Sequence, residues 1–287
     1  MDVTNPKAAC IGLSRGLHEL PCVTDQRYWD QVLVSYLDHP GRLIWRASCD
    51  AIHTSLLQAW LGPHKAWGKV LKTDLFDEAV SEGLFPELSQ IAREIHGIDL
   101  APEVVSAAQS HHPELQVMCA DIRSLPYPES SFDLVFSNST LDHFSDHADL
   151  ERSLRELHRV LQPGGSLLIT LDNLDNPVIA VRRRLPMLRK IGLVPFFPGV
   201  TLNAAGLRRV LEASGFSVSS ERTIMHSPRA LAVGLAALLS RGPVSFAPLF
   251  HRTVLGLEKL EHWPTKRFTG YYVAALAKAV KTEGATI

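Results

Sequence analysis

The stretch Glu94–Asn173 decides the fold. It contains the segments EIHGIDLAPEVVSAAQ (94–109), LQVMCADIRSLPYPESSFDLVFSNSTLDHF (115–144) and LERSLRELHRVLQPGGSLLITLDN (150–173). Four short apolar runs recur in it, and each has an acidic or polar residue at its end or just after it. The runs are Ile95–Leu100 with Asp99, Leu115–Ala120 with Asp121, Phe132–Ser137 with Asn138, and Ser166–Leu171 with Asp172. Helical patterns lie between them, which is typical of parallel strands that helices bury on both faces. Ligands of such sheets bind beyond the carboxyl ends of the strands.

Residues 69–173 resemble the class I S-adenosylmethionine-dependent methyltransferases of type 11. The most specific part of the resemblance is FDLVFSNSTLDHF (132–144) followed by ELHRVLQPGGSLLIT (156–170), which is similar to the fourth strand, the loop after it, a helix and the turn into the fifth strand. The resemblance implies an α/β fold with a doubly wound, seven-stranded, mostly parallel sheet. It also implies S-adenosylmethionine as cofactor.

The resemblance places candidate cofactor-binding residues at the ends of three strands. Asp99 would bind the ribose hydroxyls with Leu100 beside it, Asp121 and Ile122 would flank the adenine, and Ser137 and Asn138 would line the methionine side. A carboxylate suits the ribose because it accepts hydrogen bonds from both hydroxyls.

The loop after the first strand, which we expect at Lys69–Asp74, departs from the family. The family has a glycine-rich loop there, whereas this chain reads VLKTDLFDEAVSEGL and has no glycine before Gly83. Acidic residues disfavour the cofactor's carboxylate unless a cation intervenes, and Lys72 is the nearest candidate. Two readings stay open: a rebuilt site in which Asp74 binds the cofactor's ammonium, and a lost site.

His143 is the candidate catalytic residue, in the segment Leu141-Asp142-His143. An imidazole beside a carboxylate is a suitable general base for a hydroxyl or amine nucleophile. The alternative is that His143 packs or caps at a strand–helix junction, because a sulfonium electrophile needs little beyond proximity and alignment. No metal site is expected.

The domain organisation follows from composition shifts along the chain. Residues 1–65 are expected to form a helical N-terminal cover, and residues 66–287 a methyltransferase-like α/β domain with insertions at about 174–200 and 228–265. The patterns further predict a helix over Leu84–His96, and strands over Phe216–His226 and Tyr271–Ala277. Trp29, Trp45 and Trp60 are either core anchors or cavity walls. Cys119 is expected to be a buried thiol.

Composition limits the classes of function. The 287 residues are 46% hydrophobic and 21% charged, with a formal net charge of −1, so no nucleic-acid partner is expected. The longest apolar run, Ala230–Leu239, is too short to span a bilayer. The start of the sequence lacks a signal-peptide pattern, and four scattered cysteines are typical of reduced thiols, so a cytoplasmic location is expected.

The sequence therefore predicts an enzyme, a transferase that moves a methyl group from S-adenosylmethionine to oxygen or nitrogen of a small-molecule metabolite with an apolar part. The alternative is a methyltransferase-like fold that has lost methyl transfer and serves as a binding or scaffold protein or as a different enzyme. A homodimer is left open, as is the role of the basic residues Arg182–Arg184.

Overall fold

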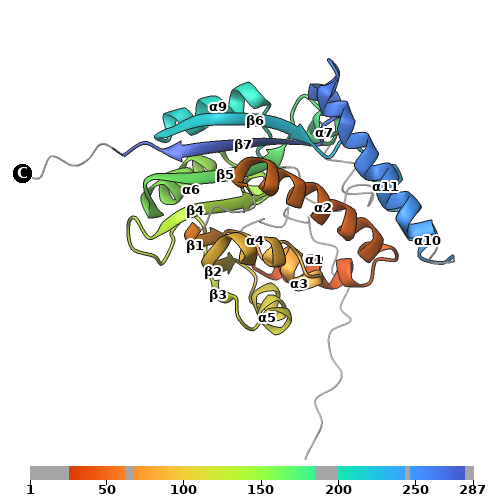
Figure 1. Cartoon of the computed structure of the whole chain (residues 1–287), viewed down its shortest axis with the longest axis horizontal. Helices are drawn as coiled ribbons and strands as arrows, with labels where there is room; N and C mark the ends of the chain where they lie inside the picture. Colours follow the sequence, from red (N-terminus) through yellow and green to blue (C-terminus); the bar gives the residue numbers. More distant parts are fainter. Residues whose placement is uncertain (1–25, 63–66, 185–198, 243–245, 282–287) are drawn as a thin grey trace, which may run out of the picture.

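A central mixed sheet organises the computed structural model, which describes residues 26–62, 67–184, 199–242 and 246–281. The described residues form a seven-stranded sheet with the order β3-β2-β1-β4-β5-β7-β6, in which β7 alone runs antiparallel to its neighbours (Figure 1). The strands are β1 (Trp67–Lys72), β2 (Ala92–Asp99), β3 (Gln116–Cys119), β4 (Phe132–Asn138), β5 (Leu161–Asp172), β6 (Phe216–Ile224) and β7 (Tyr272–Ala279). The fold class expected from the sequence is confirmed.

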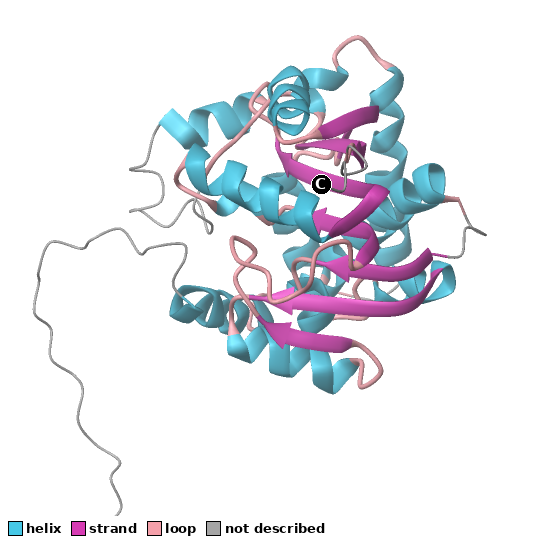
Figure 2. Cartoon of the chain, turned by 90° about the vertical axis from the view of Figure 1, so that its left-hand side faces the viewer, coloured by secondary structure: helices cyan, strands magenta, loops and turns pink. Residues whose placement is uncertain are grey.

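Helices cover both faces of the sheet (Figure 2). They are α1 (Gln26–Leu37), α2 (Arg42–Leu61), α3 (Phe76–Val80), α4 (Phe85–Ile91), α5 (Pro102–His111), η1 (Leu141–His143), α6 (His147–Val160), α7 (Pro177–Arg184), α9 (Ala204–Ala213), α10 (Arg229–Leu239), α11 (Ala247–Leu257), η3 (Glu258–His262) and α12 (Lys266–Thr269). Neighbouring strand residues point to opposite faces, so Val70 packs beneath α2 and α4, whereas Leu71 packs toward α6.

Two local expectations from the sequence are wrong. The helix predicted over Leu84–His96 ends at Ile91, and β2 begins at once at Ala92. Residues 92–96 carry no helix breaker, but they pair with β1 through Trp67–Leu71, so sheet pairing overrides the local helical pattern. Cys119 is exposed because β3 is the edge strand of the sheet, which leaves it covered on fewer sides than the central strands.

Two groups of helices lie over the carboxyl ends of the strands. One group is α1 and α2, which precede the sheet, and the other is α10, α11, η3 and α12, which connect β6 to β7. The insertion expected at 174–200 contains α7, and its residues 185–198 lie outside the described part of the chain, as do residues 1–25. Within the described residues, every helix falls short of the length and apolar character needed to cross a membrane.

The turn between α1 and α2 rests directly on α10. Gly41 adopts a left-handed backbone with φ 78°, and a Cβ at this position would lie 2.3 Å from the carbonyl carbon of Ala236. Only glycine tolerates both the positive φ and this backbone-to-backbone approach. The N-terminal helices and the β6–β7 insertion, about 190 residues apart in sequence, are therefore in direct contact.

We predict that Gly41→Ala lowers the free energy of unfolding by about 2–5 kcal/mol, because the left-handed backbone and the clash with Ala236 both add cost. Gly164 is the control, since it also has a positive φ of 73° but no atom within 4 Å of an added Cβ. Gly164→Ala should cost only about 1–2 kcal/mol in urea unfolding. Equal losses for the two variants would contradict the close contact.

Candidate active site

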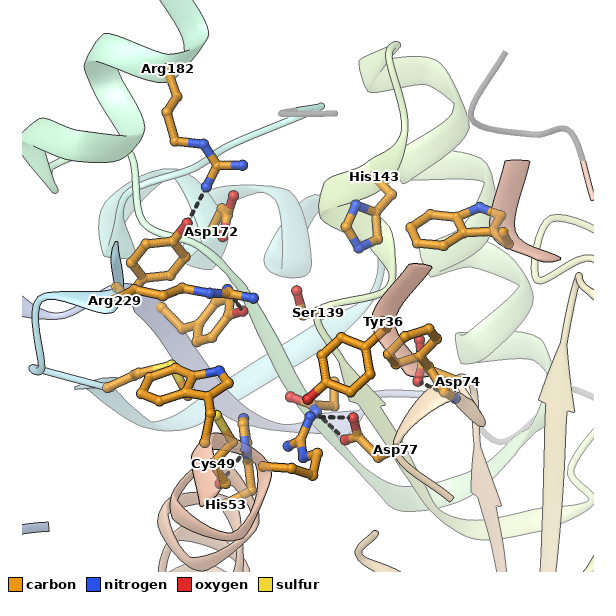
Figure 3. A pocket seen from close by; sticks show the side chains of 18 residues that line it. Tyr36, Cys49, His53, Asp74, Asp77, Ser139, His143, Asp172, Arg182 and Arg229 are labelled. Atoms are coloured by element: carbon orange, nitrogen blue, oxygen red, sulfur yellow. Dashed lines mark hydrogen bonds and ion pairs between the residues drawn. The ribbon is translucent and has the colours of Figure 1, made fainter. Parts of the chain in front are cut away.

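Two adjoining cavities lie at the carboxyl ends of the parallel strands. The outer cavity encloses about 640 Å³, partly open to solvent, above β1, β2 and the loop after β3. The central cavity encloses about 860 Å³ and is also partly open to solvent. It lies between α1, α2 and the ends of β4, β5 and β7 (Figure 3). Trp29, Asp74, Phe76 and His143 line both cavities, so these four side chains stand at the boundary between the two spaces.

The outer cavity brings together the residues expected at the nucleoside. Asp99, Leu100, Asp121 and Ile122 all line it. Asp99 accepts hydrogen bonds from the backbone N–H of Leu75 at 3.1 Å and from that of Ala101 at 2.9 Å. These two bonds fix the carboxylate while leaving further acceptor positions on its oxygens. Burial raises the pKa of Asp99 to about 6, and the two backbone donors oppose the shift.

Asp121 has a partner that the sequence did not reveal. The guanidinium of Arg123 donates to Asp121 at 2.6 Å and to Asp149 at 2.9 Å, which ties the loop after β3 to α6. Partial burial acts to raise the pKa of Asp121, but the bond from Arg123 outweighs it and lowers the pKa. Asp121 is therefore an ionised acceptor at the cavity wall, held in place by Arg123.

Lys72 does not have the position expected of it as a cation for the cofactor's carboxylate. Its side chain is only 1% exposed, and Nζ forms an ion pair of 2.8 Å with Glu78, which is fully buried. Nζ also donates to the backbone carbonyl of Asp74. Lys72 is thus a structural cation beneath the loop, and other residues line the two cavities.

The loop after β1 is rebuilt around this ion pair. Glu78 accepts a hydrogen bond from the backbone N–H of Leu84 at 3.0 Å, and its side chain fills the space beside Gly83. A Cβ at Gly83, whose φ is 59°, would lie 2.7 Å from the Glu78 carboxylate. Gly83 therefore makes room for the side chain of Glu78 at a later turn of the loop. Phe76 is the loop residue that lines both cavities.

Asp74 is the acidic side chain of the loop that faces both cavities. Its carboxylate accepts from the backbone N–H of Phe76 at 3.0 Å and lies 3.9 Å from Nζ of Lys72. Burial raises the pKa of Asp74 well above its usual range, and Lys72 opposes the shift. A cationic ligand group placed beside Asp74 would stabilise its ionised form.

The cation that reaches the central cavity from the side of the loop is Arg46, on α2. Its guanidinium binds Asp50 and Asp77, each at 2.7 Å. Burial acts to raise the pKa of Asp77, but Arg46 outweighs it and keeps the pKa below its usual value. Asn138 completes the group by donating to Asp77 at 3.1 Å. Sequence patterns around Arg46 are those of any amphipathic helix, so nothing marked it in advance.

The two polar residues that end β4 have different positions. Asn138 lines the central cavity, and its side-chain oxygen accepts from Thr170 at 2.8 Å. Ser137 is fully buried below the cavities, where its hydroxyl accepts from the hydroxyl of Thr73 at 3.0 Å. Ser137 thus supports Thr73, which lines the outer cavity, instead of lining the methionine side itself.

His143 stands between the two cavities and opposite Asp172 (Figure 3). Its ring packs edge-on against Trp29, with ring centroids 4.6 Å apart. The neighbouring carboxylate of Asp142 turns inward, where it accepts from Ser139 at 2.9 Å and from the backbone N–H of Asp172 at 3.0 Å. The acid that faces the cavity with His143 is therefore Asp172. Burial and the nearby Asp142 raise the pKa of Asp172 to about 7.

The far wall of the central cavity carries arginines and tyrosines. Arg229 donates to the hydroxyl of Tyr272 at 2.7 Å and lies over the ring of Tyr271, 5.0 Å from its centroid. Arg182 of α7 donates to the hydroxyl of Tyr271. Of the three tryptophans, Trp29 and Trp45 line the cavity. Trp60 packs partly buried against the core.

The residues present fit S-adenosylmethionine in its nucleoside half. The outer cavity offers a fixed carboxylate at Asp99 and apolar walls at Leu100, Val104 and Ile122. The methionine half would meet Asp74 as partner for its ammonium and Arg46 on the side of its carboxylate. When bound there, the cofactor supplies an electrophilic methyl group.

Comparison with known proteins agrees with this geometry. Residues 79–169 match the model of a methyltransferase domain family. The chain is 29% identical over 169 residues to a probable S-adenosylmethionine-dependent methyltransferase of Mycolicibacterium smegmatis, covering 58% of this chain and 59% of that protein. It is 42% identical over 78 residues to a malonyl-[acyl-carrier protein] O-methyltransferase of Halorhodospira halophila, covering 26% and 25%. The chain thus spans about a quarter to three fifths of these relatives.

Solved structures share the fold over nearly the whole chain. The [4+2]-cyclase SpnF superposes with a TM-score of 0.57 at 20% identity, covering 91% of this chain and 98% of that one. A complex of the Haloferax volcanii Trm112 methyltransferase activator with a methyltransferase contains a chain that superposes with a TM-score of 0.53 at 16% identity, covering 92% and 100%. The fold is that of the Rossmann-like methyltransferases. Residues 79–169 are thus similar to a methyltransferase domain, and the relatives matched over a longer stretch are named as S-adenosylmethionine-dependent methyltransferases.

We predict that Lys72→Met lowers the free energy of unfolding by about 3–5 kcal/mol, because it leaves Glu78 as an uncompensated buried charge. The double variant Lys72→Met/Glu78→Gln removes both charges and keeps an acceptor for the N–H of Leu84. It should recover at least half of the loss in urea unfolding. A single variant as stable as the unmodified protein would show that the ion pair does not organise the loop.

Proposed function

We propose that this protein transfers the methyl group of S-adenosylmethionine to an oxygen or nitrogen atom of a small molecule bound in the central cavity. The observation that carries the proposal is the position of Asp74, Phe76 and His143 between a cavity suited to a nucleoside and a cavity lined by polar and aromatic groups. A reacting atom held near His143 would lie where the two spaces meet, which is the proximity that a transfer between two bound molecules needs.

The cofactor is assigned to the outer cavity and to the loop after β1. Asp99 binds the ribose with Leu100 alongside, Asp121 and Ile122 flank the adenine, and Asp74 and Asn138 face the methionine end. Arg46 takes the place that the sequence suggested for Lys72, because it is a cation that lines the cavity. Ser137 acts through Thr73, to which it is hydrogen-bonded.

The acceptor is assigned to the central cavity, with His143 as general base. Relatives include enzymes named for small acceptors, such as the trans-aconitate 2-methyltransferase of Azoarcus, 36% identical over 91 residues. That likeness supports a small-molecule acceptor for this chain. The arginines and tyrosines of the far wall supply donors to a polar acceptor molecule.

A second candidate function is chemistry other than methyl transfer in the same cavities. The observation that favours it is the rebuilt loop, in which Asp74 and Phe76 occupy the region where the family has glycines. The structural neighbour SpnF is described as a [4+2]-cyclase, so the fold accommodates other reactions. Both candidate functions require that the cofactor binds. A protein that has lost the cofactor site would not bind it.

We predict that S-adenosylhomocysteine binds with micromolar affinity in calorimetric titration, and that Asp99→Asn weakens it about 10- to 100-fold, because a charged acceptor to two ribose hydroxyls is lost. Asp133→Asn is the matched control: Asp133 accepts from the backbone N–H of Lys69 at 2.7 Å and lies outside both cavities. It should leave the affinity unchanged. Equal affinities for the Asp99 variant and the unmodified protein would refute the ribose assignment, and absence of binding at millimolar ligand would refute the proposed cofactor site.

We predict that His143→Ala lowers the turnover number at least about 100-fold while cofactor affinity stays unchanged, because a general base contributes about that much or more. His147→Ala, at the exposed start of α6, is the control. Full turnover of the His143 variant at saturating acceptor would refute the role of His143 as general base. Proximity and alignment of the two bound molecules would then account for catalysis.

A further inference from the structure

A third cavity lies in the layer of helices above the sheet. This helical groove, between α1, α2 and the start of α10, encloses about 1000 Å³, partly open to solvent. Figure 1 shows α2 and α10 side by side, and the contact of Gly41 with Ala236 holds the α1–α2 turn against α10. None of the cofactor-binding assignments uses this space.

The helical groove adjoins the central cavity. Tyr36, Trp45 and Arg229 line both of them, so these three side chains form the partition between the two spaces. Trp45 is buried, and Tyr36 packs edge-on against Phe76 with ring centroids 5.2 Å apart. A molecule that extends past this partition would have one end in the central cavity and the other in the groove.

The groove suits an apolar chain along its length. Aromatic and aliphatic side chains of all three helices line it, among them Tyr28 and Val32 of α1, Trp45 of α2 and Val233 of α10. The polar side chains of Gln31, Ser35 and His39 and the charged side chain of Arg42 also line it. Each methylene group that is transferred from water to such a surface adds to the binding affinity.

The partition suits the polar end of the same molecule. The Arg229 guanidinium is held by the Tyr272 hydroxyl at 2.7 Å and by the face of the Tyr271 ring. A guanidinium in a fixed orientation recognises a carboxylate or phosphate better than a mobile one does, because little side-chain freedom is lost on binding. The charge of Arg229 therefore lies between the groove and the central cavity, where an apolar chain would end and a polar head would begin.

The surface beside the groove matches an amphiphile as well. Exposed leucines recur along α10 at helical spacing: Leu231 is 75% exposed, Leu235 47% and Leu238 64%. Residues 223–257 contain no aspartate or glutamate but include Arg229, Arg241 and Arg252. An apolar and basic surface favours the approach of a molecule with an apolar chain and an anionic head.

We propose that the helical groove binds the apolar chain of an amphiphilic substrate, whose anionic or strongly polar head passes Arg229 into the central cavity. The inference deepens the proposed function, on which its catalytic meaning rests, by naming the substrate class. It assigns Val32 and Val233 to substrate binding, as residues on opposite walls of the groove that touch the chain and not the reacting atoms.

The test titrates the full chain calorimetrically with butanoate, hexanoate, octanoate and decanoate below their micellar concentrations, once without S-adenosylhomocysteine and once with it. The dissociation constant should fall by about fourfold for each methylene that the groove buries. Val32→Trp, which fills the groove from α1, should abolish this dependence on chain length. Val34→Trp is the matched control, since Val34 lies on the same helix and is 61% exposed.

A second pair of variants keeps the test decisive if Val32→Trp fails to fold. Val233→Trp fills the groove from α10, and Gly234→Trp is its control, since Gly234 lies on the same helix outside the groove lining and an added Cβ there meets no atom within 4 Å. The inference is overturned if decanoate binds no tighter than butanoate, or if the folded groove variants keep the chain-length dependence. Because S-adenosylhomocysteine is titrated separately, its failure to bind would refute the proposed function, while a chain-length dependence abolished by Val32→Trp would still support the groove.

Discussion

The buried ion pair between Lys72 and Glu78 is the interaction on which the site depends. A lysine ammonium and a carboxylate without contact with water are costly unless they neutralise each other and satisfy their remaining donors and acceptors. Here Nζ also binds the carbonyl of Asp74, and Glu78 also binds the N–H of Leu84. The pair thus ties together both ends of the loop after β1. It holds in place the loop that stands where the resembled family has its glycine-rich loop.

The remaining charges of the loop follow from this pairing. Because Lys72 is committed to Glu78, Asp77 needs another cation, and α2 supplies Arg46. Asp74 is paired more weakly with Lys72, whose Nζ is 3.9 Å from its carboxylate, and burial raises its pKa. A buried acid that resists ionisation is a suitable partner for a ligand cation, because binding restores the favourable charged form. The ammonium and sulfonium of S-adenosylmethionine are such cations.

The sequence predicted the features that depend on local patterns. Strands buried on both faces produce continuous apolar runs, and polar residues at their ends fall at one edge of a parallel sheet, so Asp99 and Asp121 could be placed without a structure. Features that depend on distant partners could not be predicted. The place of Lys72 is decided by Glu78 on the next helix, the role of Arg46 by a contact with Asp77, 31 residues away, and the end of α4 by sheet pairing.

The outer cavity and the central cavity are built from different parts of the chain. The strand ends and the loops after them form most of the outer cavity, with Trp29 of α1 and Val104 of α5 beside them. Helices from the N-terminal region and from the β6–β7 connection form the remaining walls, and they meet at the partition of Tyr36, Trp45 and Arg229. Gly41 against Ala236 fixes their relative position. Changes at this partition would therefore alter the central cavity and the helical groove, whereas Asp99, Leu100, Asp121 and Ile122 of the outer cavity lie on β2 and in the loops after β2 and β3.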